Sequence, residues 1–239
     1  MQAFDSLSRD IQQYIYDKGW PSLTSIQNAA IKQVANTDHN LILSAPTASG
    51  KTEAAFIPAL NSVEDWETGL KVLYISPLKA LINDQFQRIS ELSEYLDIPI
   101  TRWHGEVSQA QKRKVVNQPK GVLLITPESI EGMLVNRPGE AQHLFKGVEW
   151  IIIDELHSFL GTERGIHLQS LLQRISQFMQ EPRFIAMSAT LNKKDFGYAK
   201  AFFGSQRDTD ILVDRDKNDL LITIDYTSGE AGPFVARES

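Results

Sequence analysis

Short apolar segments alternate with longer amphipathic segments along most of this chain, and this alternation restricts the fold more than any other feature of the sequence. The apolar segments cover residues 41–43, 72–75, 100–103, 122–125, 150–153 and 184–187. Helical patterns cover residues 7–17, 25–34, 51–62, 78–95, 127–135, 167–179 and 193–203. Strands that are apolar throughout and separated by helices are typical of parallel sheets with helices on both faces. The sequence therefore predicts an α/β domain with a central, mostly parallel sheet.

A phosphate-binding loop, Ala45-Pro-Thr-Ala-Ser-Gly-Lys-Thr52, lies between the first predicted strand and a predicted helix. Backbone N–H groups of such a loop, together with the positive end of the helix dipole, receive phosphate oxygens. The predicted nucleotide contacts are Thr47, Ala48, Ser49, Gly50, Lys51 and Thr52. Lys51 would supply a positive charge and Thr52 a hydroxyl for Mg²⁺. The pattern G-x-x-x-x-G-K-[ST] is matched except at its first position, which is Ala45.

Two carboxylates follow a buried strand, as hydrolysis of a nucleoside triphosphate with Mg²⁺ requires. Trp150-Ile-Ile-Ile153 runs directly into Asp154-Glu-Leu-His157. Asp154 would hold Mg²⁺ through its water shell, and Glu155 would orient and deprotonate the attacking water. A single Asp-Glu pair after a strand is more often a solvated turn. Together with the phosphate loop, the pair is interpreted as the second half of a site for ATP and Mg²⁺.

Further segments follow in an order that resembles superfamily 2 helicases. Ser76-Pro-Leu-Lys-Ala-Leu81 with Gln85 resembles motif Ia, Thr126-Pro-Glu128 resembles motif Ib, and Ser188-Ala-Thr190 is identical to motif III. Upstream, the segment from Gly19 to Gln27 resembles the Q motif, whose Gln binds the adenine edge. The loop form Ala-x-Thr-x-Ser-Gly-Lys-Thr is itself typical of this superfamily. The resemblance covers the chain from Phe4 to Phe203.

Within that superfamily the chain is most similar to the Lhr-like, Ski2-related helicases. The Asp-Glu-x-His form excludes strict DEAD-box proteins, and Gly161-Thr-Glu-Arg-Gly165 looks like the Gly-x-x-Arg-Gly of the Lhr-like group. Trp103-His-Gly105 agrees, although Glu106 follows where Asp is commoner. The resemblance implies a RecA-like P-loop NTPase domain, the first of two.

The resemblance also implies a coupling site and a nucleic-acid site. The coupling residues would be His157, Ser188 and Thr190, and the nucleic-acid contacts would be Pro77, Lys79, Trp103, Thr126 and Arg164. Helix N-termini and hydroxyls of this kind bind backbone phosphates of a single strand without regard to base sequence. For Trp103 the alternatives are base stacking and burial in the core, and for Arg164 they are a phosphate and a carboxylate partner. Gln27 is either the adenine contact or a polar surface residue.

The chain is expected to divide after residue 204. Residues 1–204 form the predicted RecA-like domain, with the Q-motif-like segment at 4–27. Residues 205–239 form a predicted linker, with strand-like pieces at 211–213 and 220–224, that leads towards a second RecA-like domain. No Gln-x-x-Gly-Arg-x-Gly-Arg segment is present, and in the family that segment carries an arginine finger. We therefore expect one half of a motor, whose partner domain is normally on the same polypeptide.

Composition and charge limit the partners. The net charge of -6 argues against a uniformly basic surface, so contacts with nucleic acid must be local. The cluster Lys112-Arg-Lys114 is interpreted as a solvated helix face. No apolar run approaches the roughly 20 residues that span a bilayer, and the N-terminus lacks a signal peptide. With no cysteine, thiolate zinc sites are excluded, and Mg²⁺ is the only metal expected. The protein is expected to be cytoplasmic and to have no membrane partner.

The sequence therefore predicts the ATP-binding motor domain of an ATP-dependent helicase or translocase that couples Mg-ATP hydrolysis to movement along a single strand. DNA is favoured over RNA as the strand. The alternatives are an RNA helicase of the Ski2-like branch and a regulatory module that holds ATP and a strand without performing work. A metabolic P-loop kinase has no use for Thr126-Pro-Glu128 or Ser188-Ala-Thr190. Activity of this domain alone is expected to be weak.

Overall fold

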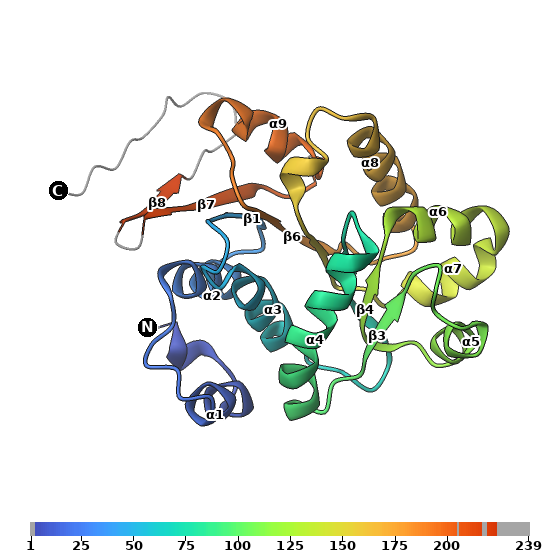
Figure 1. Cartoon of the computed structure of the whole chain (residues 1–239), viewed down its shortest axis with the longest axis horizontal. Coiled ribbons are helices and arrows are strands. Elements are labelled where there is room, and N and C mark those ends of the chain that lie inside the picture. Colours follow the sequence, from blue (N-terminus) through green and yellow to red (C-terminus); the bar gives the residue numbers. More distant parts are fainter. Residues whose placement is uncertain (1–2, 205, 217–218, 224–239) are drawn as a thin grey trace.

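The computed structural model describes residues 3–204, 206–216 and 219–223, and in this part of the chain one sheet forms the centre of the molecule (Figure 1). Its strands are ordered β3-β4-β2-β5-β6-β1-β7-β8. They are β1 Asn40–Ser44, β2 Gly69–Ile75, β3 Ile100–Trp103, β4 Lys120–Ile125, β5 Trp150–Ile153, β6 Arg183–Ser188, β7 Thr209–Asp216 and β8 Asp219–Thr223. All neighbouring pairs are parallel except β7 and β8, which are antiparallel. The predicted α/β fold with a mostly parallel sheet is confirmed.

Helices follow most strands, as the alternating pattern predicted. They are α1 Arg9–Asp17, α2 Ser25–Asn36, α3 Lys51–Ser62, α4 Lys79–Tyr95, α5 Gln109–Asn117, α6 Pro127–Asn136, α7 Pro138–Phe145, α8 Glu163–Ser176 and α9 Phe196–Ala201. None of the helices described here combines the length and the apolar character needed to cross a membrane. Short 3₁₀ turns at Phe4–Ser6, Leu156–Ser158 and Lys193–Asp195 complete the elements.

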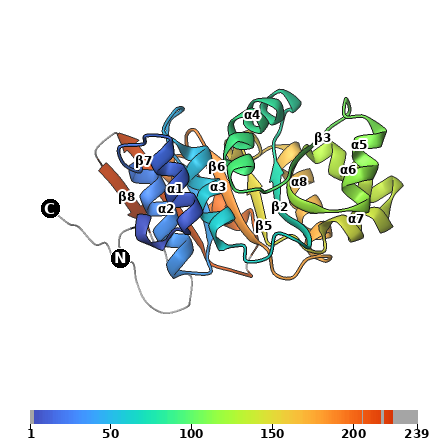
Figure 2. The ribbon, with the colours of Figure 1, turned by 90° about the horizontal axis from the view of Figure 1, so that it is seen from below.

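The sheet is buried on both faces because its strands carry apolar side chains on both. Val72 and Tyr74 of β2 face a core formed with α1, α2, α3 and α4, whereas Leu73 and Ile75 face a core formed with α6, α7, α8 and α9. Side chains of a strand point to alternate faces, so a strand buried on both sides must be apolar at every position. Figure 1 shows α1, α2 and α3 on one side of the sheet and α8 and α9 on the other; in Figure 2, which is seen from below, α1, α2 and α3 lie in front of the strands.

Several elements differ from the sequence prediction. Helix α7 was not predicted; Pro138 occupies its first turn, where the missing N–H of proline is harmless. Helix α8 begins at Glu163 rather than at residue 167, because the Thr162 side chain caps it. Helix α9 begins at Phe196 rather than at residue 193, because Lys193–Asp195 forms a 3₁₀ turn instead.

The central sheet continues past the predicted boundary at residue 204. Strand β7 pairs in parallel with β1, with Ile42 opposite Ile211, and β8 then pairs with β7. Ile211 and Val213 belong to the same buried core as Ile42. The predicted strand-like pieces at 211–213 and 220–224 therefore extend the sheet, except for residue 224. Residues 205, 217–218 and 224–239 of the predicted linker lie outside the described residues.

Gly121, at the start of β4, is required by a close backbone approach. Its φ is +70°, and a Cβ atom placed on it would lie 2.0 Å from the carbonyl oxygen of Pro99. We expect Gly121→Ala to lower the free energy of unfolding by about 2–4 kcal/mol, because positive φ and overpacking both add cost. Gly132, within α6 and without neighbours at its Cβ position, is the matched control: Gly132→Ala should raise stability by about 0.5–1 kcal/mol. Urea unfolding of both variants measures the difference, and equal effects would contradict this account.

Candidate active site

The carboxyl ends of four central strands meet at one edge of the sheet and bring the predicted nucleotide residues together. The backbone N–H of Ala45, after β1, donates to the Ser188 carbonyl of β6 at 3.2 Å. The N–H of Asp154, after β5, donates to the Ile75 carbonyl of β2 at 2.9 Å. Crevices at this edge of open parallel sheets are where such folds bind ligands.

The loop at residues 45–52 has the conformation of an anion cradle. Gly50 has a φ of +83° and precedes α3 without a side-chain cap, so the first N–H groups of that helix remain free for a ligand. A Cβ atom at Gly50 would lie 2.5 Å from the Gln27 side-chain nitrogen, so a larger residue would displace Gln27 as well as strain the backbone at this positive φ. Ala48 also has a positive φ, of 61°, and the buried Ser49 hydroxyl has no hydrogen-bond partner among the described residues. A group of phosphate oxygens fits these free donors.

Lys51 lies over this loop. Its Nζ donates to the backbone carbonyls of Ala45 and Pro46. Burial lowers the pKa of Lys51, while the nearby charges of Glu155 and Asp154 oppose that shift. The ammonium group is thus held close to the cradle by neutral carbonyls that a phosphate can replace.

Asp154 and Thr52 provide hard oxygen donors of the kind that Mg²⁺ prefers. Asp154 is only 6% exposed; its Oδ1 accepts the Glu155 N–H at 2.9 Å, and its Oδ2 accepts the hydroxyl of Tyr74. Burial raises the pKa of Asp154, and the Tyr74 hydrogen bond opposes that rise. The Thr52 hydroxyl donates to Oε1 of Gln85 at 3.1 Å and keeps its lone pairs for another ligand. The donor set therefore fits Mg²⁺.

Glu155 is connected to the predicted coupling residues through His157. Glu155 has a φ of 50°, in the left-handed region that a glutamate rarely adopts. Its Oε2 lies 3.3 Å from Nδ1 of His157, and the same nitrogen lies 3.3 Å from the Ser188 hydroxyl oxygen. The Ser188 hydroxyl donates its own proton to the Thr190 carbonyl at 2.8 Å. The Glu155 carboxylate and the Ser188 oxygen can then only accept a hydrogen bond from Nδ1. The ring proton of His157 is therefore assigned to Nδ1.

Gln27 is buried against the phosphate loop rather than exposed as a polar surface residue. Its Oε1 accepts the Thr24 N–H at 2.9 Å in a capping box at the start of α2. Its Nε2 donates to the Gly50 carbonyl at 3.4 Å. These bonds fix the position of Gln27 beside the cradle. Its contact with an adenine remains a prediction.

Four of the predicted nucleic-acid residues lie along the same edge of the sheet. Arg164 donates from Nη2 to the Pro77 carbonyl at 2.7 Å and to Glu128 Oε1 at 2.6 Å, so the carboxylate alternative is the one present here. Thr126 caps α6 by accepting the Ser129 N–H. Arg164 thus joins the motif Ia and motif Ib segments in space.

Lys79 begins α4, whose N-cap residue Leu78 makes no side-chain capping bond. The Lys79 ammonium pairs with Glu106, and this pairing lowers the pKa of Glu106. Trp103 is 6% exposed and belongs to the core on the α6 face. That burial corresponds to the core alternative, and the structure does not support Trp103 as a base-stacking platform.

Sequence reasoning missed two side chains that support the site, Tyr74 and Arg88, and named Gln85 only as part of motif Ia. Tyr74 escaped notice because it lies in an apolar strand, although a buried tyrosine hydroxyl needs a partner and so carried a signal. Gln85 and Arg88, both on α4, hold the start of α3: Gln85 accepts from Thr52, and Arg88 donates to Glu53 at 3.0 Å. The same helix begins at Lys79, so α4 connects the nucleotide edge with the predicted nucleic-acid residues.

Replacement of Asp154 should stabilise the fold in a pH-dependent manner. Because burial raises the pKa of Asp154 above its ordinary value of 3.8, ionisation costs stability as pH rises through the folded pKa. Asp154→Asn removes this cost and keeps both hydrogen bonds if Tyr74 accepts from the amide. We expect the variant to have the larger free energy of unfolding at neutral pH, and the difference to shrink as the pH falls towards 3.8. Urea unfolding at several pH values tests this; equal stability throughout would contradict it.

Comparison with known proteins agrees with this geometry. Residues 24–196 match the family model described as DEAD/DEAH box helicase. The chain is 29% identical over 241 residues to the ATP-dependent helicase Lhr-Core of Methanocaldococcus jannaschii, covering 93% of this chain and 28% of that protein.

Two solved structures are also similar to this chain. One is the helicase Lhr of Mycobacterium smegmatis bound to single-stranded DNA and AMP-PNP, with a TM-score of 0.78 and 28% identity over 90% of this chain and 28% of that one. The other is the DUF1998 helicase MrfA bound to DNA, with a TM-score of 0.75 and 26% identity over 88% of this chain and 30% of that one. The chain spans less than a third of the length of these relatives.

Proposed function

Because the chain belongs to the DEAD/DEAH box helicase family, we propose that it is the ATP-binding motor domain of an ATP-dependent DNA helicase or translocase. In this proposal it couples Mg-ATP hydrolysis to movement along a single strand. One observation carries the proposal: the predicted ATP and Mg²⁺ residues, Lys51, Thr52, Asp154 and Glu155, meet at one edge of the sheet. The motif Ia and motif Ib segments, which Arg164 joins, lie along the same edge. The working unit includes a second RecA-like domain, normally on the same polypeptide, and residues 205–239 lead towards it.

The nucleotide is held by groups that are already in place. Lys51 exchanges the Ala45 and Pro46 carbonyls for the β- and γ-phosphates, and the free N–H groups at the start of α3 bind phosphate oxygens. Gln27 binds the adenine edge with polar atoms that now cap α2. Thr52 and Asp154 would hold Mg²⁺ through their oxygen atoms. When bound, Mg²⁺ supplies positive charge that neutralises the terminal phosphates.

Glu155 orients the attacking water and accepts its proton. The Nδ1 proton of His157 restrains the Glu155 carboxylate and also reaches Ser188, so a change at the phosphates can be transmitted to motif III. Closure of the second domain is needed for fast turnover, because that domain supplies an arginine to the transition state. The isolated chain is therefore a weak ATPase.

Substitution of Lys51 and of Glu155 separates binding from hydrolysis. We expect Lys51→Ala to weaken Mg-ATP binding by at least about tenfold, because a charge-assisted contact with the phosphates is lost. Glu155→Gln should bind ATP normally but hydrolyse it about 10²–10⁴ times more slowly, since the general base is gone. Titration with a fluorescent ATP analogue and phosphate release measure the two effects. Lys32→Ala, at an exposed position of α2, is the control and should change neither.

Normal ATP binding by Lys51→Ala would exclude the proposed phosphate contact. Full hydrolysis by Glu155→Gln would show that the base lies elsewhere. If both variants behave as expected but no nucleic acid stimulates turnover even with the second domain present, the regulatory-module alternative is favoured.

The strand is held along its backbone. The uncapped start of α4 at Leu78 presents backbone N–H groups to phosphate oxygens, and Lys79 adds charge. The Thr126 hydroxyl at the start of α6 supplies a further contact, and Pro77 precedes α4 without an N–H of its own. Arg164 either contributes directly or positions Pro77 and Glu128. DNA is favoured over RNA because two structures that share 28% and 26% of their residues with the chain, those of Lhr and MrfA, are described as bound to DNA. Comparing ATPase stimulation by single-stranded DNA and RNA of one sequence distinguishes this from the Ski2-like alternative. We place this activity in the cytoplasm.

Glu106 competes with phosphate for Lys79. We expect Glu106→Gln to strengthen binding of single-stranded DNA by about two- to fivefold at low salt, because an exposed ion pair of modest strength is removed. One more available cation should also steepen the dependence of log K on log salt by about 0.7. Glu67→Gln, which breaks the exposed pair with Lys120, is the matched control. Fluorescence anisotropy with labelled oligo-dT measures both quantities, and an unchanged salt slope would refute the competition.

A further inference from the structure

Strand β3 ends the sheet and leaves one row of backbone groups open. Within the described residues β3 pairs with β4 alone. The Pro99 carbonyl accepts the Val122 N–H at 2.8 Å, so residues 99, 101 and 103 point their polar groups towards β4. By the alternation of a strand, Ile100 and Arg102 point theirs away from it. Such open groups are a template for another strand.

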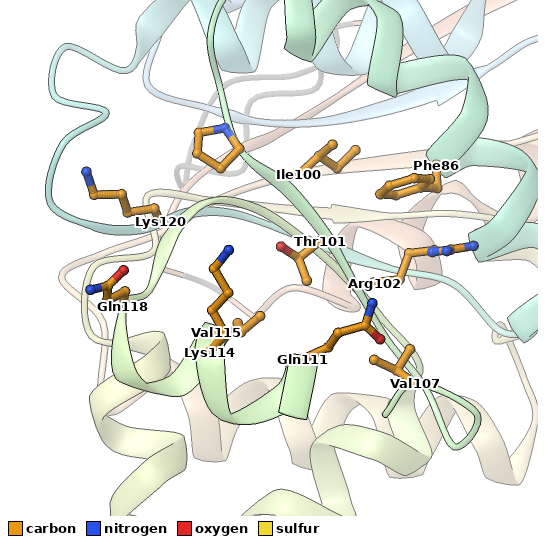
Figure 3. A pocket seen from close by; sticks show the side chains of 11 residues that line it. Phe86, Ile100, Thr101, Arg102, Val107, Gln111, Lys114, Val115, Gln118 and Lys120 are labelled. Atoms are coloured by element: carbon orange, nitrogen blue, oxygen red, sulfur yellow. The ribbon is translucent and has the colours of Figure 1, made fainter. Parts of the chain in front are cut away.

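A groove with a volume of about 480 Å³ follows this open edge (Figure 3). Phe86 of α4 and Ile100 of β3 lie on one side of the space, and Gln111 and Val115 of α5 lie across from them. Helix α5 has no fully buried residue, although Val115 packs partly against the core, and the groove beside it is open to solvent. The four residues of β3 offer about 13 Å of edge at 3.3 Å per residue.

The two walls of the groove differ in chemistry. Ile100 packs with Phe86 against the α4 core, and the Arg102 guanidinium lies 4.4 Å from the centre of the Phe86 ring. The opposite wall is mainly polar, with Thr101, Gln111, Lys114 and Gln118. An extended segment along β3 would direct alternate side chains to these two walls.

The charge of the groove is opposite in sign to that of the chain. Its charged lining residues are Arg102, Lys114 and Lys120, and no carboxylate lines it, although the chain carries a net charge of -6. Lys120 is paired with Glu67 and Arg102 donates to Asn83, whereas Lys114 forms no ion pair with the described residues. An incoming acidic group thus meets one unpaired ammonium and two further cations.

We propose that this groove binds an extended segment of a partner protein in which aliphatic and acidic residues alternate, and that the segment joins the sheet as a strand beside β3. The aliphatic side chains pack on Phe86 and Ile100, and the carboxylates face Lys114 and Lys120 on the other wall. Backbone hydrogen bonds to Ile100 and Arg102 supply affinity, and the alternate side chains supply specificity.

Two other occupants fit less well. A second copy of this chain would bring Arg102, Lys114 and Lys120 against the same residues, and like charges at paired strands are destabilising. A nucleic-acid strand is expected at the carboxyl ends of the strands, where Pro77 and Thr126 lie. Pro99 and Lys120 of the groove instead lie at the starts of β3 and β4.

The test uses a fluorescein-labelled heptapeptide of alternating valine and glutamate and the complete 239-residue chain. We expect saturable binding by anisotropy that is at least about tenfold stronger than that of the valine–lysine peptide, because charge complementarity selects the acidic one. N-methylation of the peptide amides on one edge should abolish binding. Hydrogen exchange at the Ile100 and Arg102 amides should slow when the peptide is bound.

Lys114→Glu should weaken peptide binding by about tenfold, because it replaces the ammonium that faces the peptide carboxylates with a negative charge. Val115→Asp should also weaken binding, because it adds a negative charge to the same wall of the groove. Arg113→Glu makes the same charge change on α5 but does not line the groove, so it should alter binding by less than about twofold. Unchanged binding of Mg-ADP and unchanged melting temperature show that each variant is folded.

Equal binding of the acidic and basic peptides, no effect of N-methylation, or equal losses from Arg113→Glu and Lys114→Glu would each overturn the proposal. Displacement of the peptide by oligo-dT together with loss of oligo-dT binding in Lys114→Glu would assign the groove to nucleic acid instead. Dimerisation that Lys114→Glu strengthens would assign it to a second copy of the chain.

Discussion

Burial of a parallel sheet on both faces is the constraint on which the rest of this structure depends. Each central strand is apolar along its length, so polar groups are confined to the strand ends, and parallel strands place all their carboxyl ends at one edge. Lys71 and Tyr74 are the exceptions within β2: the Lys71 ammonium is paired with Glu149 and the Tyr74 hydroxyl with Asp154, as buried polar groups require. The apolar interior therefore restricts reactive polar groups to the strand ends. Burial also makes the ionised form of Asp154 less stable, which raises its pKa.

The nucleotide edge and the predicted strand-binding edge are joined by rigid elements. Helix α4 contacts the start of α3 through Gln85 and Arg88, and its own start adjoins Pro77, to which Arg164 donates. Arg164 is positioned by the first turn of α8, where a Cβ atom at Gly165 would lie 1.9 Å from the Phe159 carbonyl oxygen. Gly165, the second glycine of Gly-x-x-Arg-Gly, is thus required for steric reasons that do not depend on any contact with nucleic acid.

The sequence predicted those parts of the fold that are set by local periodicity. The bounds of β3, β5 and α3 agree with the structure to the residue, because apolar runs and the phosphate loop mark their ends. Helix α7 and the true start of α8 were missed, since a proline can begin a helix as well as end one and a threonine cap resembles a loop. The place of β7 beside β1 could not be predicted, because strand order depends on pairing between segments distant in the chain.

The same division holds for the site. By itself the sequence determined the identities of Lys51, Thr52, Asp154 and Glu155 and their places after buried strands, because a loop pattern and a period of two are local properties. Only the tertiary structure decided that Arg164 pairs with Glu128, that Lys79 pairs with Glu106, and that Trp103 is buried. Side chains acquire partners from other strands and helices, and which of these come within hydrogen-bonding distance is set by packing that no local pattern encodes.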